Sequence, residues 1–307
     1  MDLIGCGTAL VTPFRADGAI DEQSLYSLVQ WQIESGINWI VACGTTAETP
    51  SLNEEEWLRV IRIITEAAAG RVPVWAGCTH NSTREAVHKA RIAAQVPDVT
   101  AILTANPYYN KPGQEGQYQH FKAVAHAVKL PVVLYNIPSR TGTNLEPATV
   151  MRLIEDAPNI VGIKESSGSL PQITELVTQA PRSFSVYSGD DNMALGAIGV
   201  GARGLVSVAS NEIPAEMSRM IEEALTGDWP VARQINRKYY RLIQANFWET
   251  SPAPVKAVMA MMGRIEEHYR LPMTPVSQAT RSRLERLVGE LGLLVHAPQE
   301  EGDYRMF

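Results

Sequence analysis

The chain has 307 residues and a formal net charge of −6. This length fits one large barrel or two ordinary domains, and the acidic balance disfavours nucleic acid and anionic membranes as partners. The three cysteines are few, odd in number and set in apolar runs, which indicates reduced core thiols of a cytoplasmic protein and argues against a disulfide framework.

Eight short apolar runs alternate with stretches of helical periodicity. Because these runs do not alternate with polar residues, they predict a parallel sheet buried on both faces. Eight strand–helix units in ~220 residues fit a closed (β/α)8 barrel, the TIM-barrel fold of the α/β class, better than an open doubly wound sheet. The expected strands cover residues 7–13, 39–43, 72–78, 101–104, 131–135, 160–164, 184–188 and 204–208.

Helical periodicity predicts a helix after each strand. Two of these helices are expected to begin at capping boxes, one at Ser51-Leu52-Asn53-Glu54 and one at Ser82-Thr83-Arg84-Glu85. A third motif, Gly199-Val200-Gly201-Ala202-Arg203-Gly204, matches GxGxxG. It follows a helix and opens a strand, the reverse of a dinucleotide-binding fingerprint, so it predicts a tight turn.

No convincing strand follows Gly227, and the helical pattern returns three times, over residues 229–245, 254–262 and 275–292. The expected organisation is a barrel carrying the active site over residues 1–226, a C-terminal helical region over 227–296 and a flexible polar tail over 297–307. No run approaches the ~18 apolar residues of a membrane span. The six histidines lack HExxH spacing, so no metal site is expected.

Lys164 ends the sixth expected strand. Desolvating an ammonium is expensive, and burial favours the neutral amine. A neutral amine can attack a ketone and form a Schiff base. The structural alternative is a side chain that extends to water from a turn.

Polar side chains follow the other strands, at the end where barrel active sites lie. Tyrosine and threonine hydroxyls can relay the protons that Schiff-base formation requires. A Gly-Thr-Thr turn before a helix N-terminus can bind a carboxylate, and an arginine can bind a second one. These residues are Thr45, Thr46, Tyr108, Tyr109, Tyr135, Arg140, Asp190, Asp191 and Ser207.

Each of these residues also has a structural interpretation. Tyr135 could fill the barrel, and Thr45 and Thr46 could cap a turn. Arg140 could be a solvated loop charge. Asp190 and Asp191 are expected to be N-caps of the short helix that follows. Their convergence with Lys164 on one rim favours an active site.

Seven motifs in the same order resemble the dihydrodipicolinate synthase family, within the pyruvate-dependent class I aldolase superfamily, over about residues 7–292. The motifs are Gly44-Thr45-Thr46-x-Glu48, Pro107-Tyr108-Tyr109-Asn110, Tyr135-Asn136-Ile137-Pro138-x-Arg140-Thr141-Gly142, Gly162-Ile163-Lys164-Glu165, Ser188-Gly189-Asp190-Asp191, Pro254-Val255-Lys256 and Leu271-Pro272-Met273-Thr274-Pro275.

The resemblance implies a reaction without metal or nucleotide, in which pyruvate forms an imine with Lys164 and condenses with L-aspartate-4-semialdehyde to give 4-hydroxy-tetrahydrodipicolinate, a step of lysine and diaminopimelate biosynthesis. It implies a relay of Tyr135, Thr45 and Tyr109, with Tyr109 supplied by a neighbouring subunit of a dimer or tetramer. The implied substrate-binding residues are Thr46, Arg140, Gly189 and Val206.

The chain departs from the family pattern at three positions. Ala47 stands where the family has glycine, which would cost energy if that residue had a positive φ. Glu54 and Trp57 stand where members inhibited by lysine carry histidines, although Asn81, Glu85 and Tyr108 match other residues of that regulatory pocket. The departures predict weak or absent inhibition by lysine.

Two alternatives stay open. A sister aldolase, such as N-acetylneuraminate lyase or a 2-keto-3-deoxy-sugar-acid aldolase, would share the lysine and the tyrosine. The double threonine, Arg140 and the tyrosine pair argue against it. A catalytically silent barrel could bind a keto acid as a regulator, but Lys164, Tyr135 and Thr45 are all present.

Overall fold

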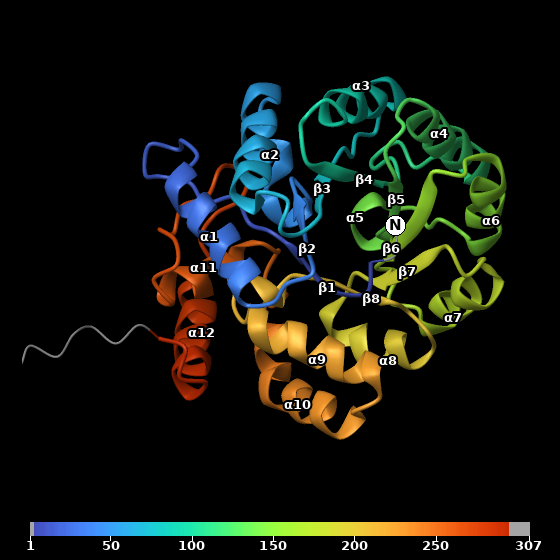
Figure 1. The fold of residues 1–307 in the computed structure, drawn as a ribbon. Helices are drawn as coiled ribbons and strands as arrows, with labels where there is room; N and C mark the ends of the chain where they lie inside the picture. Colours follow the sequence, from blue (N-terminus) through green and yellow to red (C-terminus); the bar gives the residue numbers. More distant parts are fainter. Residues whose placement is uncertain (1–2, 295–307) are drawn as a thin grey trace, which may run out of the picture.

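The computed structural model describes residues 3–294, and its centre is a closed barrel of eight parallel strands in sequential order. Figure 1 shows the strands surrounded by helices. The predicted (β/α)8 barrel is confirmed. The strands are β1 (Gly5–Ala9), β2 (Trp39–Ala42), β3 (Val74–Gly77), β4 (Val99–Ala105), β5 (Val132–Asn136), β6 (Ile160–Glu165), β7 (Ser185–Ser188) and β8 (Gly204–Ser207).

The outer helices follow the strands in turn, and further helices come after the barrel. Within residues 3–294, none of them is long and apolar enough to cross a bilayer. The barrel helices are α1 (Glu22–Glu34), α2 (Glu54–Ala68), α3 (Thr83–Ala93), α4 (Gln114–His126), α5 (Pro138–Thr141), α6 (Pro147–Asp156), α7 (Leu170–Gln179), α8 (Ala194–Gly199) and α9 (Pro214–Thr226). The C-terminal helices are α10 (Trp229–Ala245), α11 (Ala253–Met261) and α12 (Gln278–Glu290).

Aromatic side chains fill the inside of the barrel. The ring of Trp39 lies 5.2 Å from that of Trp75 and 5.3 Å from that of Tyr187, measured between centroids. Gly7 makes room for this cluster, because a Cβ at that position would lie 2.0 Å from the indole nitrogen of Trp39. The barrel is therefore a packed core, and a ligand can enter only at its ends.

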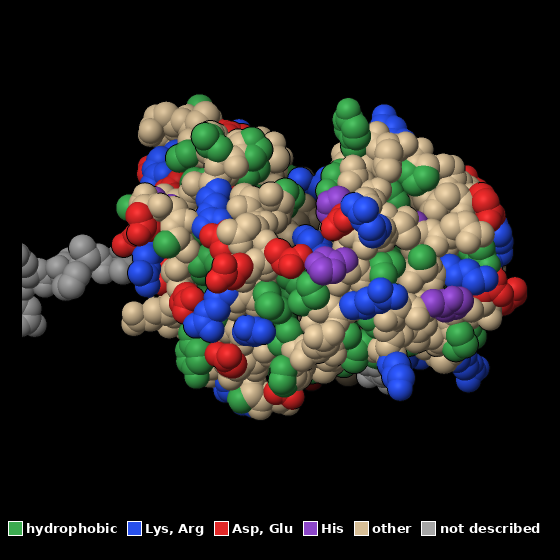
Figure 2. Space-filling model, turned by 90° about the horizontal axis from the view of Figure 1, so that it is seen from above, with side chains coloured by type: hydrophobic (Ala, Val, Ile, Leu, Met, Phe, Trp, Pro, Cys, Tyr) green, Lys and Arg blue, Asp and Glu red, His purple; other side chains and the backbone are tan. Residues whose placement is uncertain are grey.

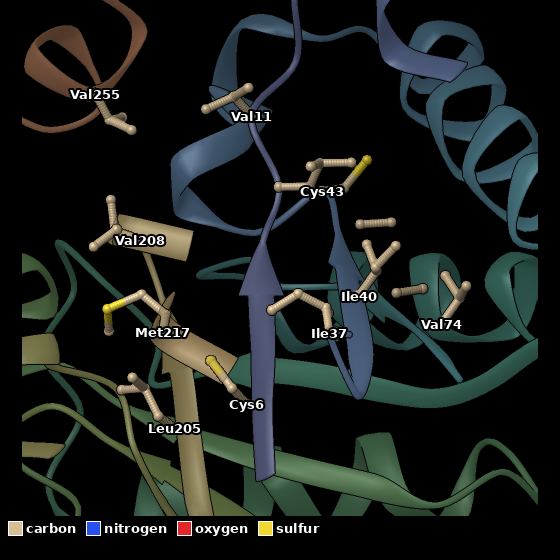
Figure 3. Close-up of a cluster of buried hydrophobic side chains, with 14 of the residues drawn as sticks. Cys6, Val11, Ile37, Ile40, Cys43, Val74, Leu205, Val208, Met217 and Val255 are labelled. Carbon is tan, nitrogen blue, oxygen red and sulfur yellow. The ribbon is translucent and has the colours of Figure 1, made fainter. Parts of the chain in front are cut away.

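The helices after the barrel share its hydrophobic core. Residues 253–259 of α11 are all buried. Figure 3 shows Val255 of α11 near Val11, which follows β1, and Val208, which follows β8. Thus α11 lies near the C-terminal ends of β1 and β8 (Figure 3), and β8 carries the predicted site residues Val206 and Ser207. The tail predicted over residues 297–307 lies outside the described residues.

Neither predicted capping box forms as expected, although α3 begins after Ser82 as predicted. The capping box of α2 joins Asn53 and Glu56, two residues later than predicted, because Ser51 belongs to a 3-10 turn (η2, Thr49–Ser51). At α3, Ser82 is the N-cap but its side chain makes no cap hydrogen bond. Its backbone N–H donates instead to Nδ1 of His80.

The GxGxxG segment forms the predicted turn. Gly199 ends α8 and Gly204 begins β8, so the segment connects a helix to the strand after it. Gly201 has a φ of 108°, a conformation that glycine adopts at little cost. The segment therefore leads from a helix into a strand, the reverse of the order that a dinucleotide-binding fingerprint requires.

His120 on α4 gives the fold a pH dependence. Burial, with a smaller contribution from His80, lowers its pKa to about 4, against about 6.5 in an unfolded chain. The folded chain therefore binds fewer protons between these values, so the free energy of unfolding falls by about 3 kcal/mol from about pH 7 to about pH 4 through this group. In urea unfolding, His120→Gln is expected to lack that part of the loss. Equal losses in both proteins would contradict this assignment.

Candidate active site

Lys164 lies in β6 with a side chain that is 5% exposed. The strand register pairs it with Tyr135 of β5, and its Nζ lies 4.3 Å from the centre of the Tyr135 ring. The predicted burial of the lysine and its proximity to a tyrosine are both observed. The arrangement holds an amine and a phenol hydroxyl in one water-poor space.

Gly189, which follows β7, gives the lysine its space. A Cβ at Gly189 would lie 2.7 Å from Cε of Lys164 and 2.0 Å from Oγ of Ser166. The same oxygen of Ser166 is buried and has no hydrogen-bond partner among the residues that the structure describes. Ser166 was not predicted as a site residue. Its position directly after Lys164-Glu165 is the feature of the sequence that could have indicated a place in the site. Val206 of β8 is buried in the same inner cluster as Tyr135.

A cavity of about 500 Å³ lies at the C-terminal ends of β2 to β5. Its lining includes Thr45, Tyr108, Tyr135 and Arg140, so four of the predicted rim residues meet there. Figure 2, seen from the side of α2 and α3, shows the surface hollowed between two lobes. The cavity is large enough for two small organic acids.

Thr45 and Thr46 belong to a 3-10 turn, η1 (Thr45–Ala47), which precedes α2 in the chain. Thr46 is buried, whereas Thr45 reaches the cavity. Ala47 does not have the positive φ at which its methyl group would cost energy, because the positive φ angles of this turn fall on Cys43 (54°) and Glu48 (53°). The methyl group of Ala47 is buried without a left-handed backbone.

Tyr109 is not part of the site of its own chain. Its side chain is 87% exposed. Its φ is 71°, and the N–H of Asn110 donates to the carbonyl of Tyr108 across it at 2.8 Å. Such a three-residue turn is strained for a residue with a side chain. The structure thus presents a tyrosine outward on a fixed loop.

Arg140 and the two aspartates differ in role. Arg140 lines the cavity, and its Nη2 donates to the carbonyl of Ser251 at 3.0 Å. Asp190 caps the 3-10 turn η3 (Asp191–Met193), as predicted. Asp191 does not: it is buried and accepts hydrogen bonds from Oγ of Ser207 and, at 3.0 Å, from N–H of Val208. Burial raises its pKa.

Glu165, the residue after Lys164 in β6, is held by a network of hydrogen bonds, and it was not predicted to have a role. Its buried carboxylate accepts hydrogen bonds from Asn136 at 3.0 and 3.2 Å, from Gln172 at 3.0 Å and from N–H of Ser167 at 2.6 Å. These bonds join β5, β6 and α7 next to the amine. The Gly162-Ile163-Lys164-Glu165 motif contains this residue, but the sequence around it does not predict its hydrogen-bond partners Asn136 and Gln172.

The sequence model of the Dihydrodipicolinate synthetase family matches residues 2–291. The chain belongs to this family. The 4-hydroxy-tetrahydrodipicolinate synthase of Acidobacterium capsulatum is 74% identical over 298 residues, which cover 97% of this chain and 99% of the relative. The enzyme of the same name from Koribacter versatilis is 56% identical over 297 residues, which cover 97% and 99%.

A solved structure agrees in fold. The dihydrodipicolinate synthase of Acinetobacter baumannii, described as chloride-inhibited and complexed with pyruvate, has a TM-score of 0.93 and 42% identity, and the match covers 95% of this chain and 100% of that one. The resemblance inferred from the motifs is confirmed. As a member of the dihydrodipicolinate synthetase family, the chain is a lyase of the Schiff-base aldolase type.

Proposed function

We propose that the chain condenses pyruvate with L-aspartate-4-semialdehyde to give 4-hydroxy-tetrahydrodipicolinate, in the biosynthesis of lysine and diaminopimelate. The observation that carries the proposal is the buried amine of Lys164 against the ring of Tyr135. Family membership and the names of relatives that match nearly full length support the choice of substrates.

The chemistry begins at Lys164. Its neutral amine attacks the ketone carbon of pyruvate, and the carbinolamine loses water when Tyr135 donates a proton to the departing hydroxyl. The resulting imine draws electrons from the methyl carbon, which loses a proton and becomes an enamine. The enamine attacks the aldehyde carbon, and Thr45 and Tyr135 carry the protons. The amino group of the second substrate then attacks the imine carbon and releases Lys164.

Four residues are proposed to hold the substrates. Thr46 and the backbone around it bind the carboxylate of pyruvate, and Gly189 and Val206 shape the space beside Lys164. Arg140 binds the carboxylate of the aldehyde, because it lines the cavity and has a guanidinium suited to bidentate recognition. The imine itself is the electron sink, so the proposal includes no metal or nucleotide. We place the reaction in the cytoplasm, where its substrates are made.

The proposed active unit is at least a dimer. Tyr109 is exposed and held in a strained turn in its own chain, which favours insertion beside the Tyr135 of a second copy. There its hydroxyl completes the relay with Tyr135 and Thr45. A tetramer would pair two such dimers.

The choice of aldehyde has a direct test. Steady-state rates are measured for condensation of pyruvate with aspartate semialdehyde and for cleavage of N-acetylneuraminate and of 2-keto-3-deoxy sugar acids. The proposal predicts that condensation is by far the fastest reaction. A preference for cleaving a sugar acid would assign the chain to a sister aldolase.

Arg140→Met is expected to weaken binding of the second substrate selectively. Loss of a charge-assisted pair with a carboxylate is worth about 1.5–3 kcal/mol, so the KM for aspartate semialdehyde rises about 10- to 100-fold. The rate of pyruvate trapping by borohydride stays within about twofold, because imine formation does not involve Arg140. An equal loss in both measurements would contradict the assignment.

Lysine is expected to inhibit weakly or not at all. Trp57 is buried, and its indole N–H donates to the carbonyl of Gly77 at 3.0 Å, so this side chain offers no acceptor for a ligand. The ammonium of Lys89 already lies 5.4 Å from the Trp57 ring centre, and Glu54 pairs with His88 at 2.8 Å. A titration of lysine against initial rate checks this. Strong inhibition at millimolar lysine would contradict it.

A further inference from the structure

A buried ion pair joins the C-terminal helical region to the turn that carries Thr45 and Thr46. Nζ of Lys256, on α11, donates to Oε1 of Glu48 at 2.6 Å, and the two side chains are 0% and 1% exposed. The ammonium also lies 4.5 Å from the ring centre of Phe14 and 5.0 Å from that of Tyr269. Both charged groups are therefore shielded from bulk solvent.

The main chain of Glu48 is part of the turn itself. Its N–H donates to the carbonyl of Thr45 at 3.2 Å, and its carbonyl accepts from N–H and Oγ of Ser51 at 2.9 and 2.8 Å. Its φ of 53° lies in the left-handed region. Fixing the carboxylate of Glu48 therefore fixes the shape of the turn three residues from Thr45.

The C-terminal helical region also forms hydrogen bonds to the chain around Glu48 at other points. The backbone N–H of Arg270 donates to Oε2 of Glu48 at 3.3 Å, and its guanidinium donates to the carbonyl of Ser51 at 3.0 Å. The carbonyl of Ser251 accepts from Arg140. One segment of the chain thus contacts both the turn with Thr45 and the residue proposed to bind the aldehyde.

Stability alone does not account for the pair. Replacing a buried ion pair by apolar side chains of similar volume is often neutral or stabilising. A left-handed φ at a residue with a side chain adds a further cost. Both costs fall on the turn that lines the cavity beside Tyr135, which favours a role in geometry.

We propose that Glu48 and Lys256 are positioning residues, which hold the η1 turn so that the hydroxyl of Thr45 reaches the Lys164–Tyr135 pair and Thr46 meets the substrate carboxylate. The inference rests on the proposed function of Lys164 and Thr45. It assigns the C-terminal helical region a part in catalysis, through α11 and not through any group that touches substrate.

The test is the double variant Glu48→Gln/Lys256→Met, which removes both charges and keeps the side-chain volumes. We expect a folded protein whose kcat is reduced about 100-fold, the scale of a misplaced catalytic group. The control is Glu290→Gln/Arg241→Met, which removes an ion pair between α12 and α10 with a 3.0 Å contact. The control is expected to keep kcat within about twofold.

Coupling to Thr45 separates positioning from general support. If the pair acts through Thr45, adding Thr45→Val to the double variant lowers kcat little further, whereas independent effects multiply. A double variant that folds and keeps the wild-type kcat would overturn the inference, as would multiplying effects. If the double variant does not fold, isosteric Glu48→Gln is judged by the same criteria, and loss of folding there too would assign the pair to stability and overturn the inference.

The wild-type enzyme, treated with pyruvate and borohydride in parallel, reports on the proposed function separately. Wild-type trapping together with full activity of the double variant would refute only the positioning role. Absence of wild-type trapping would refute the proposed function and, with it, this inference.

Discussion

Lys164→Ala is expected to reduce turnover of pyruvate by about four to six orders of magnitude, the scale observed when a covalent nucleophile is removed. The reason is that, within residues 3–294, Lys164 is the lysine whose amine lies over the Tyr135 ring. Without the imine, the methyl group of pyruvate has no electron sink and no enamine forms. The measurement is the initial rate with both substrates at saturation.

The matched control for this prediction is Lys129→Ala, which removes an exposed lysine between α4 and β5. It is expected to keep the wild-type rate and the wild-type unfolding midpoint. A Lys164→Ala variant with a rate within tenfold of the wild type would show that the reaction does not pass through an imine at this residue.

Lys256→Met is expected to lower the free energy of unfolding by about 3–5 kcal/mol, because it leaves the carboxylate of Glu48 buried without its cation. Burial lowers the pKa of Lys256, and the nearby Glu48 opposes that shift. Each of the two buried charges is therefore stabilised by the other and not by water. Urea unfolding at neutral pH measures the loss.

The stability of Lys256→Met is compared with that of the double variant Glu48→Gln/Lys256→Met. With neither charge present, most of the lost stability is expected to return, since the cost comes from the orphaned carboxylate and not from the missing contact. A single variant as stable as the double one would contradict the role assigned to the pair.

Much of the barrel could be predicted because apolar runs report burial directly. The same property explains why one strand was predicted to extend too far. The first run was expected to be a strand over residues 7–13, but β1 ends at Ala9. Leu10 and Val11 are still buried, but the N–H of Val11 donates to the side chain of Asn211, and Val11 shares a hydrophobic cluster with Val255 of α11 (Figure 3). Burial continues there after strand pairing has stopped.

The site was predictable where a local rule applied. Lys164 and Tyr135 each lie one residue before the C-terminal end of a parallel strand, and such ends meet on one face of a barrel. The pair of Glu48 and Lys256 was not predictable, because 208 positions separate them and neither leaves a pattern around itself. Asp191 illustrates the same limit: a cap was expected from its neighbours, but its partners are Ser207, the last residue of β8, and Val208, which follows it.

The central claim is that a buried amine on β6 bonds covalently to an α-keto acid. The most direct measurement is peptide mass analysis after treating the enzyme with pyruvate and borohydride. The account predicts that the peptide containing Lys164 gains the mass of one reduced pyruvate and that no other lysine peptide does. An unchanged Lys164 peptide from enzyme that still turns over pyruvate would contradict it.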